Sequence, residues 1–342
     1  MVTIVDLIPD IEQTHYPLLD AVLCVHGTLV DASCRACIRS CPRHAWRLTD
    51  EALEIDTGAC DGCGLCLPAC PQQALSLPIQ PAYRYRGQEK IALAACDRVV
   101  QIGQEGAVPC LHRFGIRELM DAHARDVREW IIATGDCGSC ERATNKTIQF
   151  AVRLLNLALL QRHLPEISLH EKSSSDWTTV LESPDTTDQR PVSRRDFFRG
   201  ISRTRTEAGK QDNGKPVRGQ LLNSEGLMPC RCSIDTETCD LCDACCKVCP
   251  TNVIRFEKGE NRNRLIVDSS ACNGCMHCVD VCEATAVSVS PWKQASIQAI
   301  ACDERRCSTC GVDYQSFPED SGSLCRICRK TDHRRSLFQT FT

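Results

Sequence analysis

Apolar residues recur with two different periods in the first half of the chain, and these periods predict alternating strands and helices. Short apolar runs in EKIALAAC, GAVPC and REWIIATGDC read as strands ending at Cys96, Cys110 and Cys137. FGIRELMDAHARD and NKTIQFAVRLLNLALLQRHL carry their apolar residues at helical spacing instead. The resulting β-α-β-α order predicts a small, mostly parallel sheet, with the cysteines just beyond the carboxyl ends of its strands.

A second pattern occurs four times. The segments CPRHAWRL, CPQQALSL, CPTNVIRF and CEATAVSV place apolar residues four, five and seven positions after a cysteine. AWRLTDEALEID and VIRFEKGENRNRLIVD, which follow two of these cysteines, read as strand–turn–strand. Four copies of one half-motif predict two similar units, each with an approximate internal two-fold, in an α+β protein.

The segment from residue 171 to residue 228 is polar and predicts a flexible linker, because it offers little apolar surface to offset its ordering entropy. Within it, SRRDFFRG resembles a twin-arginine export signature, but a polar stretch follows. We therefore expect a short amphipathic docking helix there, or a remnant of gene fusion. The expected organisation has five parts: repeated units at 1–85 and 229–295, a small α/β domain at 86–170, the linker at 171–228 and a tail at 296–342.

Charge and composition exclude several classes of function. A net charge of −4 and a pI near 6.2 give no attraction to nucleic acid or anionic membranes. No apolar run approaches the ~18 residues of a membrane helix, and the acidic N-terminal stretch lacks the basic region of a secretory signal. We therefore expect a cytoplasmic protein, with no integral membrane segment. Twenty-eight cysteines in such a chain indicate metal or cluster ligation rather than disulfides.

The third cysteine block carries two full Cys-x2-Cys-x2-Cys-x3-Cys runs, the first followed by Pro250 and the second by Glu283. They resemble the runs of bacterial ferredoxins with two [4Fe-4S] clusters. Three thiolates of one tight loop can cap three irons of a cube, but that loop cannot also reach the fourth corner, so the fourth ligand comes from the other run. The predicted quartets are Cys239, Cys242, Cys245 with Cys282, and Cys272, Cys275, Cys278 with Cys249. Zinc is the alternative, but zinc needs only four cysteines and no interleaving.

The first block repeats this logic with one ligand missing. Its complete cluster is predicted to use Cys60, Cys63, Cys66 and Cys41; the other has Cys34, Cys37 and Cys70 only. Asp31 occupies the register of the missing cysteine, and a three-iron cube is also conceivable. We favour Cys24 as the fourth ligand, because thiolate binds iron better than carboxylate and Gly27 lets the connection fold back.

The second block contains a quartet of another kind: Cys96, Cys110, Cys137 and Cys140. Its sequence, VPCLHRFGIRELMDAHARDVREWIIATGDCGSC, resembles the iron–sulfur delta subunit of methyl-viologen-reducing hydrogenases, without a paired Cys-x2-Cys ahead of Cys96. The resemblance implies a [2Fe-2S] cluster on this quartet. A zinc site and a redox-active Cys137/Cys140 dithiol are the alternatives.

The last block has two Cys-x2-Cys knuckles separated by fourteen residues, the pattern of a zinc ribbon: Cys307, Cys310, Cys325 and Cys328. Its polar surroundings favour structural zinc over a rubredoxin-like iron, and metal binding would stabilise a tail too small to fold alone. Four cysteines have no predicted role: Cys230, Cys232, Cys246 and Cys302.

We expect a polyferredoxin-like electron-transfer protein that works with redox partner proteins and binds no nucleic acid. Its predicted cofactors are four [4Fe-4S] clusters, one [2Fe-2S] cluster and one zinc ion. The sequence shows no nucleotide-binding fingerprint, so we expect a partner to supply two-electron chemistry and the chain itself to be non-catalytic. The alternatives are a redox enzyme subunit with thiol or disulfide chemistry at the middle domain, and an accessory or maturation factor that docks on an oxidoreductase.

Overall fold

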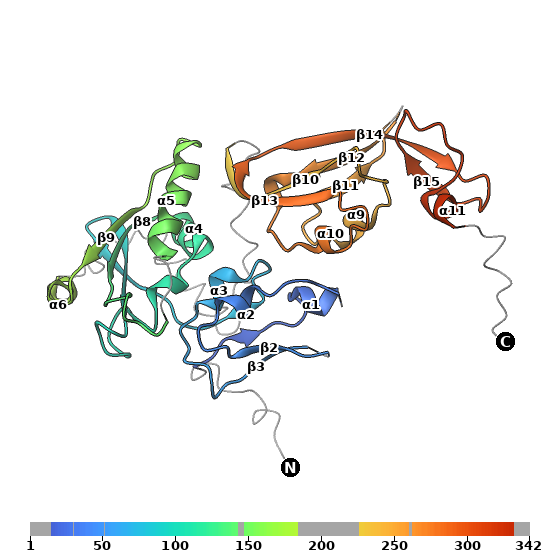
Figure 1. The fold of residues 1–342 in the computed structure, drawn as a ribbon. Coiled ribbons are helices and arrows are strands. Elements are labelled where there is room, and N and C mark those ends of the chain that lie inside the picture. The colour runs from blue at the N-terminus through green and yellow to red at the C-terminus, as the bar shows by residue number, and fades with distance from the viewer. Residues whose placement is uncertain are drawn as a thin grey trace, which may run out of the picture. The chain divides into compact units, whose positions relative to one another are not determined.

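The computed structural model describes residues 15–29, 31–50, 52–142, 147–183, 226–259 and 262–331. The chain divides into two compact units, residues 1–27 with 35–221, and residues 28–34 with 222–342 (Figure 1). The predicted docking helix at residues 193–200 lies outside the described residues. No helix among the described residues is both long and apolar enough to cross a bilayer.

The first part of unit 1 is a small fold of two antiparallel strand pairs and short helices. Strand β1 pairs with β4, and β2 pairs with β3, so the predicted hairpin is present and the β1–β4 pair joins the ends of the repeat. Trp46, Leu53 and Leu75 are buried between them. The elements are β1 (Leu18–Leu19), α1 (Val25–Thr28), α2 (Ala36–Ser40), β2 (Trp46–Leu48), β3 (Leu53–Ile55), α3 (Cys66–Ala69) and β4 (Leu75–Ser76).

The rest of unit 1 is built on a mostly parallel sheet, as predicted. Its order is β5-β6-β8-β9 with β7 beside β6; only the β5–β6 pair is antiparallel. Strand β6 ends at Cys96 as expected, but β7 ends at Val108 and β8 at Ala133, short of Cys110 and Cys137. The elements are β5 (Ala82–Arg86), β6 (Glu89–Cys96), β7 (Ala107–Val108), η3 (Leu111–Arg113), α4 (Ile116–Ala124), β8 (Val127–Ala133), α5 (Thr147–Leu160), β9 (Ser168–Lys172) and α6 (Ser174–Glu182).

Both faces of this sheet are covered. Ala92 and Trp130 belong to the core shared with α4 and α5, whereas Leu93 and Ile131 pack with Trp177 of α6. A strand buried on both faces reads as a continuous apolar run, which is the reason for the unbroken IALAA in β6.

The predicted linker begins later than expected. Residues 168–172 form β9, which extends the parallel sheet, and α6 covers residues 174–182. Trp177 is 0 % exposed, and the side chain of Ser173 accepts a hydrogen bond from the backbone N–H of Asp176 to cap this helix. The segment is polar on average, and this composition does not show that one large apolar side chain, Trp177, is buried. The prediction of a flexible linker is therefore wrong for residues 171–183.

Unit 2 repeats the arrangement of the first fold with longer strands. Strand β10 pairs antiparallel with β13, and β11 pairs with β12 as the predicted hairpin. Figure 1 shows α9 and α10 on one side of these strands. The elements are β10 (Leu227–Ile234), α9 (Ala244–Val248), β11 (Ile254–Glu257), β12 (Asn263–Asp268), η5 (Ser269–Ala271), α10 (His277–Asp280), β13 (Val287–Gln294), β14 (Ile297–Arg306), β15 (Asp313–Ser316) and α11 (Arg326–Lys330).

The C-terminal tail is not a separate fold, contrary to the predicted boundary at residue 296. Strand β14 pairs with β12 over six residue pairs, from Asn263 opposite Cys302 to Asp268 opposite Ile297, and then with β15. Leu265 on β12 is 1 % exposed and Cys302 on β14 is 0 % exposed. The first strand of the tail therefore completes the sheet of the repeated unit, a pairing between distant segments that composition does not reveal.

The burial of Trp177 makes a direct prediction. A Trp177→Ala substitution should lower the free energy of unfolding of unit 1 by about 3–5 kcal/mol, because it removes a fully buried indole from one face of the sheet. Anaerobic urea unfolding followed by circular dichroism measures the change. Thr179→Ala, on the exposed side of the same helix, is the control and should change it by less than about 0.5 kcal/mol. Equal effects of the two variants would contradict the assignment of α6 to the core.

Candidate metal centres

Each complete cysteine run wraps its loop through left-handed backbone conformations. In the first unit, Gly62 and Gly64 have φ values of 68° and 75° and stand on either side of Cys63. The same two places in the other runs also have positive φ: Leu241 and Asp243, and Gly274 and Met276. This alternation turns a seven-residue loop around a common point, so that its three thiols can face one centre.

The fourth cysteine of each run has its own repeated geometry. The residue three places later has a φ between 50° and 62° in all four copies: His44, Gln73, Asn252 and Thr285. In three copies the next backbone N–H donates to the cysteine sulfur, from Ala45 to Cys41 at 3.3 Å, and at 3.2 Å to Cys249 and Cys282. These N–H groups stabilise thiolates, the form that binds metal.

In unit 2, cysteines from both runs line one pocket, which is the arrangement that crossed ligands would need. Cys239, Cys242 and Cys245 line one pocket together with Cys282 of the other run. The backbone N–H of Leu241 donates to the Cys239 sulfur at 3.4 Å. The four thiols therefore face a shared space, as interleaved cluster ligands should.

The second quartet of unit 2 is accompanied by additional cysteines. Burial, together with the neighbouring charges of Cys278 and Cys249, raises the pKa of Cys275 to about 11. Cys232, one of the cysteines without a predicted role, is 1 % exposed and hydrogen-bonds to Cys278. The other three cysteines without a predicted role lie near proposed ligands or in the core. The Cys230 sulfur packs against Gly274, Cys246 is hydrogen-bonded to Cys245, and Cys302 is buried in the sheet.

In unit 1, cysteines of the predicted complete quartet are near one another. Burial raises the pKa of Cys66 to about 11, and its electrostatic neighbours are Cys41 and Cys60. The Trp46 side chain hydrogen-bonds to the Cys66 thiol and opposes that rise. Cys63 lies in the same loop, where burial raises its pKa to about 12.

The incomplete quartet favours Cys24 over Asp31. Cys24 is 8 % exposed and packs in the same core as Cys37 and Cys70, whereas Asp31 is exposed. The turn that contains Cys24 is tight, since a Cβ at Gly27 would come within 1.9 Å of the Ala21 carbonyl oxygen. The position of Cys24 in this core is the structural support for the sequence prediction.

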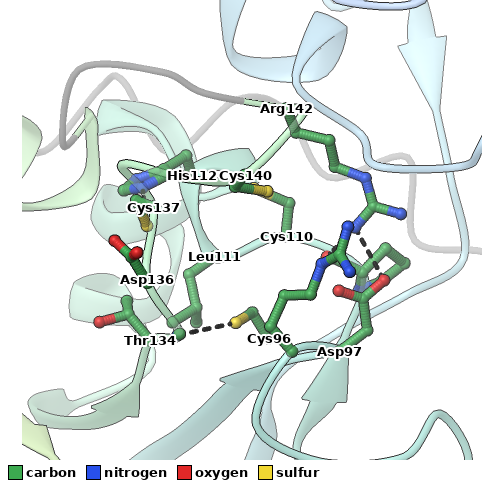
Figure 2. A pocket seen from close by; sticks show the side chains of 13 residues that line it. Cys96, Asp97, Cys110, Leu111, His112, Thr134, Asp136, Cys137, Cys140 and Arg142 are labelled. Carbon is green, nitrogen blue, oxygen red and sulfur yellow. Dashed lines mark hydrogen bonds and ion pairs between the residues drawn. The ribbon is translucent and has the colours of Figure 1, made fainter.

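The middle quartet lines one pocket at the carboxyl edge of the parallel sheet (Figure 2). Cys96 ends β6, Cys110 follows β7, and Cys137 and Cys140 follow β8. The Cys96 sulfur accepts a hydrogen bond from the Gly135 backbone N–H at 3.2 Å. Burial raises the pKa of Cys110 to about 11, with Cys96 and Cys137 among its charged neighbours.

Buried polar groups surround this pocket, and several lack partners. His112 is 3 % exposed; its Nε2 lies 3.5 Å from the Cys137 sulfur, and its Nδ1 has no hydrogen-bond partner. Burial lowers the pKa of His112, so the imidazole is neutral at pH 7. Arg142 donates to Asp97 Oδ2 at 2.7 Å, whereas Asp97 Oδ1 is unpartnered. Four thiols, a neutral imidazole and a nearby guanidinium fit a metal centre with negative net charge.

The C-terminal quartet is much tighter. The sulfurs of Cys307, Cys310, Cys325 and Cys328 all lie within 4.8 Å of one another. Backbone N–H groups of Cys310 and Cys325 lower the pKa of Cys307 to about 6, which favours its thiolate at neutral pH. Four thiolates around one zinc ion have their sulfurs about 3.8 Å apart, so this spacing fits a single ion.

Sulfur spacing separates this site from the others. No other group of three or more potential metal-ligand atoms within residues 15–331, outside the undescribed gaps, is as close as 4.8 Å. The C-terminal quartet is therefore the group whose sulfur spacing fits a single ion.

Sequence comparisons agree with this geometry in both units. Residues 32–75 and residues 238–286 each match a 4Fe-4S dicluster domain family. The chain contains two 4Fe-4S dicluster domains. Two such domains imply four [4Fe-4S] clusters, so the chain is an iron–sulfur protein.

A curated relative resembles a short part of the chain. It is a subunit of the ion-translocating oxidoreductase complex of Methanosarcina acetivorans. The two proteins are 43% identical over 44 residues, which cover 13% of this chain and 17% of that protein. The chain thus spans about a sixth of the length of that relative.

The charged residues between the cysteines were not predicted from the sequence. Asp61 and Asp240 occupy the same position in their runs, directly after the first cysteine, and an alignment of the individual cysteine runs would have singled them out. His112 is part of the quoted middle segment, but a single histidine carries no signal of burial beside a cysteine. Arg142 likewise has no sequence pattern, because its partners come from three separate segments.

The incomplete quartet generates a prediction. Cys24→Ser should remove one thiolate ligand, so that a three-iron EPR signal appears or about four irons per protein are lost. Asp31→Asn is the matched control and should leave the spectrum and iron content unchanged. The opposite result, a silent Cys24→Ser and a damaging Asp31→Asn, would assign the ligand to the carboxylate.

Proposed function

We propose that this iron–sulfur protein transfers electrons between a donor and an acceptor oxidoreductase. The observation that carries the proposal is the presence of two dicluster domains, and in unit 2 cysteines of both runs line one pocket. Clusters of this kind carry single electrons, while the polypeptide sets their spacing, potential and docking surface. The curated relative is named as a subunit of an oxidoreductase complex, which supports a protein partner for this chain too.

We assign the four clusters by the crossing rule. One cluster in each domain has a full run plus the distant cysteine, as supported by the shared pocket in unit 2 and by the neighbouring charges in unit 1. The fourth ligand of the incomplete cluster is Cys24, on the strength of its burial. The proposed quartets are Cys41, Cys60, Cys63 and Cys66; Cys24, Cys34, Cys37 and Cys70; Cys239, Cys242, Cys245 and Cys282; Cys249, Cys272, Cys275 and Cys278.

The middle quartet is proposed to hold a [2Fe-2S] cluster. Its four cysteines line one pocket, and within the described residues the C-terminal quartet is the group with the compact spacing of a single-ion site. When bound, such a cluster supplies a one-electron centre. The chain contributes the Gly135 backbone N–H, which stabilises thiolate charge on Cys96, and the His112 ring, which does the same for Cys137 in the tautomer with the proton on Nε2.

The C-terminal quartet is proposed to hold zinc in a structural role. The four sulfurs have the compact spacing of one tetrahedral ion, and β14 and β15 lead directly into the knuckles. Because β14 is also part of the dicluster sheet, an ion at this site would stabilise the end of that sheet.

Iron content and reducibility test the proposed function. Protein purified without oxygen should contain about sixteen irons from the four cubes, and about two more if the middle quartet holds a [2Fe-2S] cluster. Dithionite should bleach the broad visible absorption, and a low-potential redox protein should then be able to accept the electrons. A holoprotein with mostly zinc, or one whose clusters remain oxidised in dithionite, would overturn electron transfer as its function.

The zinc assignment has a separate test. Cys328→Ser should reduce zinc to less than about a tenth of one ion per protein and leave iron unchanged, because Cys328 belongs only to the compact quartet. Elemental analysis measures both metals in one sample. Cys246→Ser, another cysteine outside the proposed iron quartets, is the control and should retain the zinc. Loss of iron instead of zinc in Cys328→Ser would identify a rubredoxin-like iron.

A further inference from the structure

Arg142 connects the middle quartet to a cluster loop of the first dicluster domain. Its guanidinium donates to Asp61 Oδ2 at 2.7 Å, to Asp97 Oδ2 at 2.7 Å and to the Pro109 carbonyl oxygen at 2.6 Å. Each acceptor stands next to a proposed ligand: Asp61 follows Cys60, Asp97 follows Cys96, and Pro109 precedes Cys110. Arg142 itself is two residues after Cys140, so one side chain ties together the ligand loops of two centres.

The two centres also touch through their ligands. Cys63 of the dicluster domain, Leu65 and Cys110 of the middle quartet form one buried cluster. Arg113 lies beside them, 3 % exposed, with its guanidinium 3.3 Å from where a Cβ on Gly64 would be. Its pKa is lowered to about 10 by burial, so it stays charged at pH 7, and Nη1 has no hydrogen-bond partner. A buried cation here offsets the negative charge of thiolates on both sides.

The Arg142 bridge is partly shielded from water. The side chains of Arg142 and Asp61 are 12% and 19% exposed, and that of Asp97 is 23% exposed. Ion pairs at this depth are less screened than surface pairs, so the charge of Arg142 acts on the nearby ligands.

Unit 2 contains the same connection at the same position of its motif. Arg326 directly follows Cys325 of the compact quartet and donates to Asp240 Oδ2 at 3.2 Å. Asp240 follows Cys239 as Asp61 follows Cys60. Arg326 also lies 3.4 Å from Glu283, which takes the place of the usual proline after Cys282. In both units, therefore, an arginine from an accessory quartet binds the aspartate inside a Cys-Asp-x-Cys loop.

We propose that Arg142 and Arg326 are positioning residues that fix each accessory quartet against one particular cluster of its dicluster domain and raise the reduction potential of that cluster. In unit 1 the cluster is that of Cys41, Cys60, Cys63 and Cys66, and in unit 2 it is that of Cys239, Cys242, Cys245 and Cys282. This inference rests on the proposed function, and it names which cluster is adjacent to which accessory centre.

The direction of the effect follows from charge. Reduction adds one negative charge to a cluster, so a nearby cation favours the reduced form and nearby carboxylates oppose it. Removing Arg142 would delete one positive charge, take away the ion pair of Asp97 and leave Asp61 paired with the more exposed Arg43 alone. These changes lower the potential, and only the adjacent centres should feel them strongly.

Potentiometric titration followed by EPR tests the proposal on the full-length protein. Arg142→Gln should shift the ratio of reduced to oxidised cluster about tenfold toward oxidised at a given potential, which is 59 mV for a one-electron couple. The affected signal should be the one that disappears in Cys60→Ser. Arg142→Lys keeps the positive charge but cannot donate to all three acceptors in the same geometry. Its potential should therefore lie between those of the wild-type protein and Arg142→Gln.

The chain offers matched controls. Arg43 also contacts Asp61, at 3.3 Å, but is 39% exposed and reaches neither Asp97 nor Pro109, so Arg43→Gln should shift the signal by less than half as much. In unit 2, Arg326→Gln should shift one other cluster signal, while Arg329→Gln, which breaks only the contacts of Arg329 with Asp320 and Leu324, should not.

Unchanged potentials in Arg142→Gln with full iron content would overturn the proposal, and so would an equal shift of all four cubes. Loss of metal from the middle quartet alone, in a variant with unchanged circular dichroism, would support the positioning role. If elemental analysis finds zinc in the middle quartet, the [2Fe-2S] assignment fails, but the shift of the adjacent [4Fe-4S] signal still decides the role of Arg142.

Discussion

A seven-residue loop can direct three thiols at one centre only if residues between the cysteines adopt the left-handed backbone conformation. The rest of this structure depends on that constraint. Glycines provide the left-handed conformation at Gly62 and Gly64, whereas Leu241 and Met276 adopt it at a cost of about 1–2 kcal/mol each. Binding of the inorganic cluster must offset that cost, so loop conformation and metal loading are coupled. The fourth thiol then has to come from the other half of the repeat, which forces the two halves to fold together.

Charge is the second organising element. Many thiolates in a small volume repel one another, and burial further disfavours their ionised form, as the raised pKa values of Cys63 and Cys110 show. Positively charged arginines reduce this repulsion and stabilise the ionised thiols. Arg113 is buried beside these thiols, and Arg142 links their loops. The recurrence of an arginine–aspartate pair at Asp240 shows that the ligand loop itself offers a docking point for neighbouring structure.

The sequence predicts features that depend on local spacing and fails where distant segments meet. Short-range patterns predict the placing of Cys282 beside the other cysteine run, the hairpins and the parallel middle sheet. They do not predict the pairing of β12 with β14, because neither strand carries a mark of its partner. The same reason hides Arg142, whose acceptors lie in three segments. The burial of Trp177 was not predicted for a different reason. The average polarity of a segment does not show that a single indole within it packs against the core.

The position of β14 imposes an order on biosynthesis. Strand β12 lies within the second dicluster domain, but its outer hydrogen-bonding edge is covered only by residues 297–302 and the strand that contains them. These residues leave the ribosome after the last iron-ligating cysteine run has been made. The sheet of this dicluster domain can therefore be completed only after all of its cysteine runs have been synthesised. Strand β14 thus closes the domain in time as well as in space.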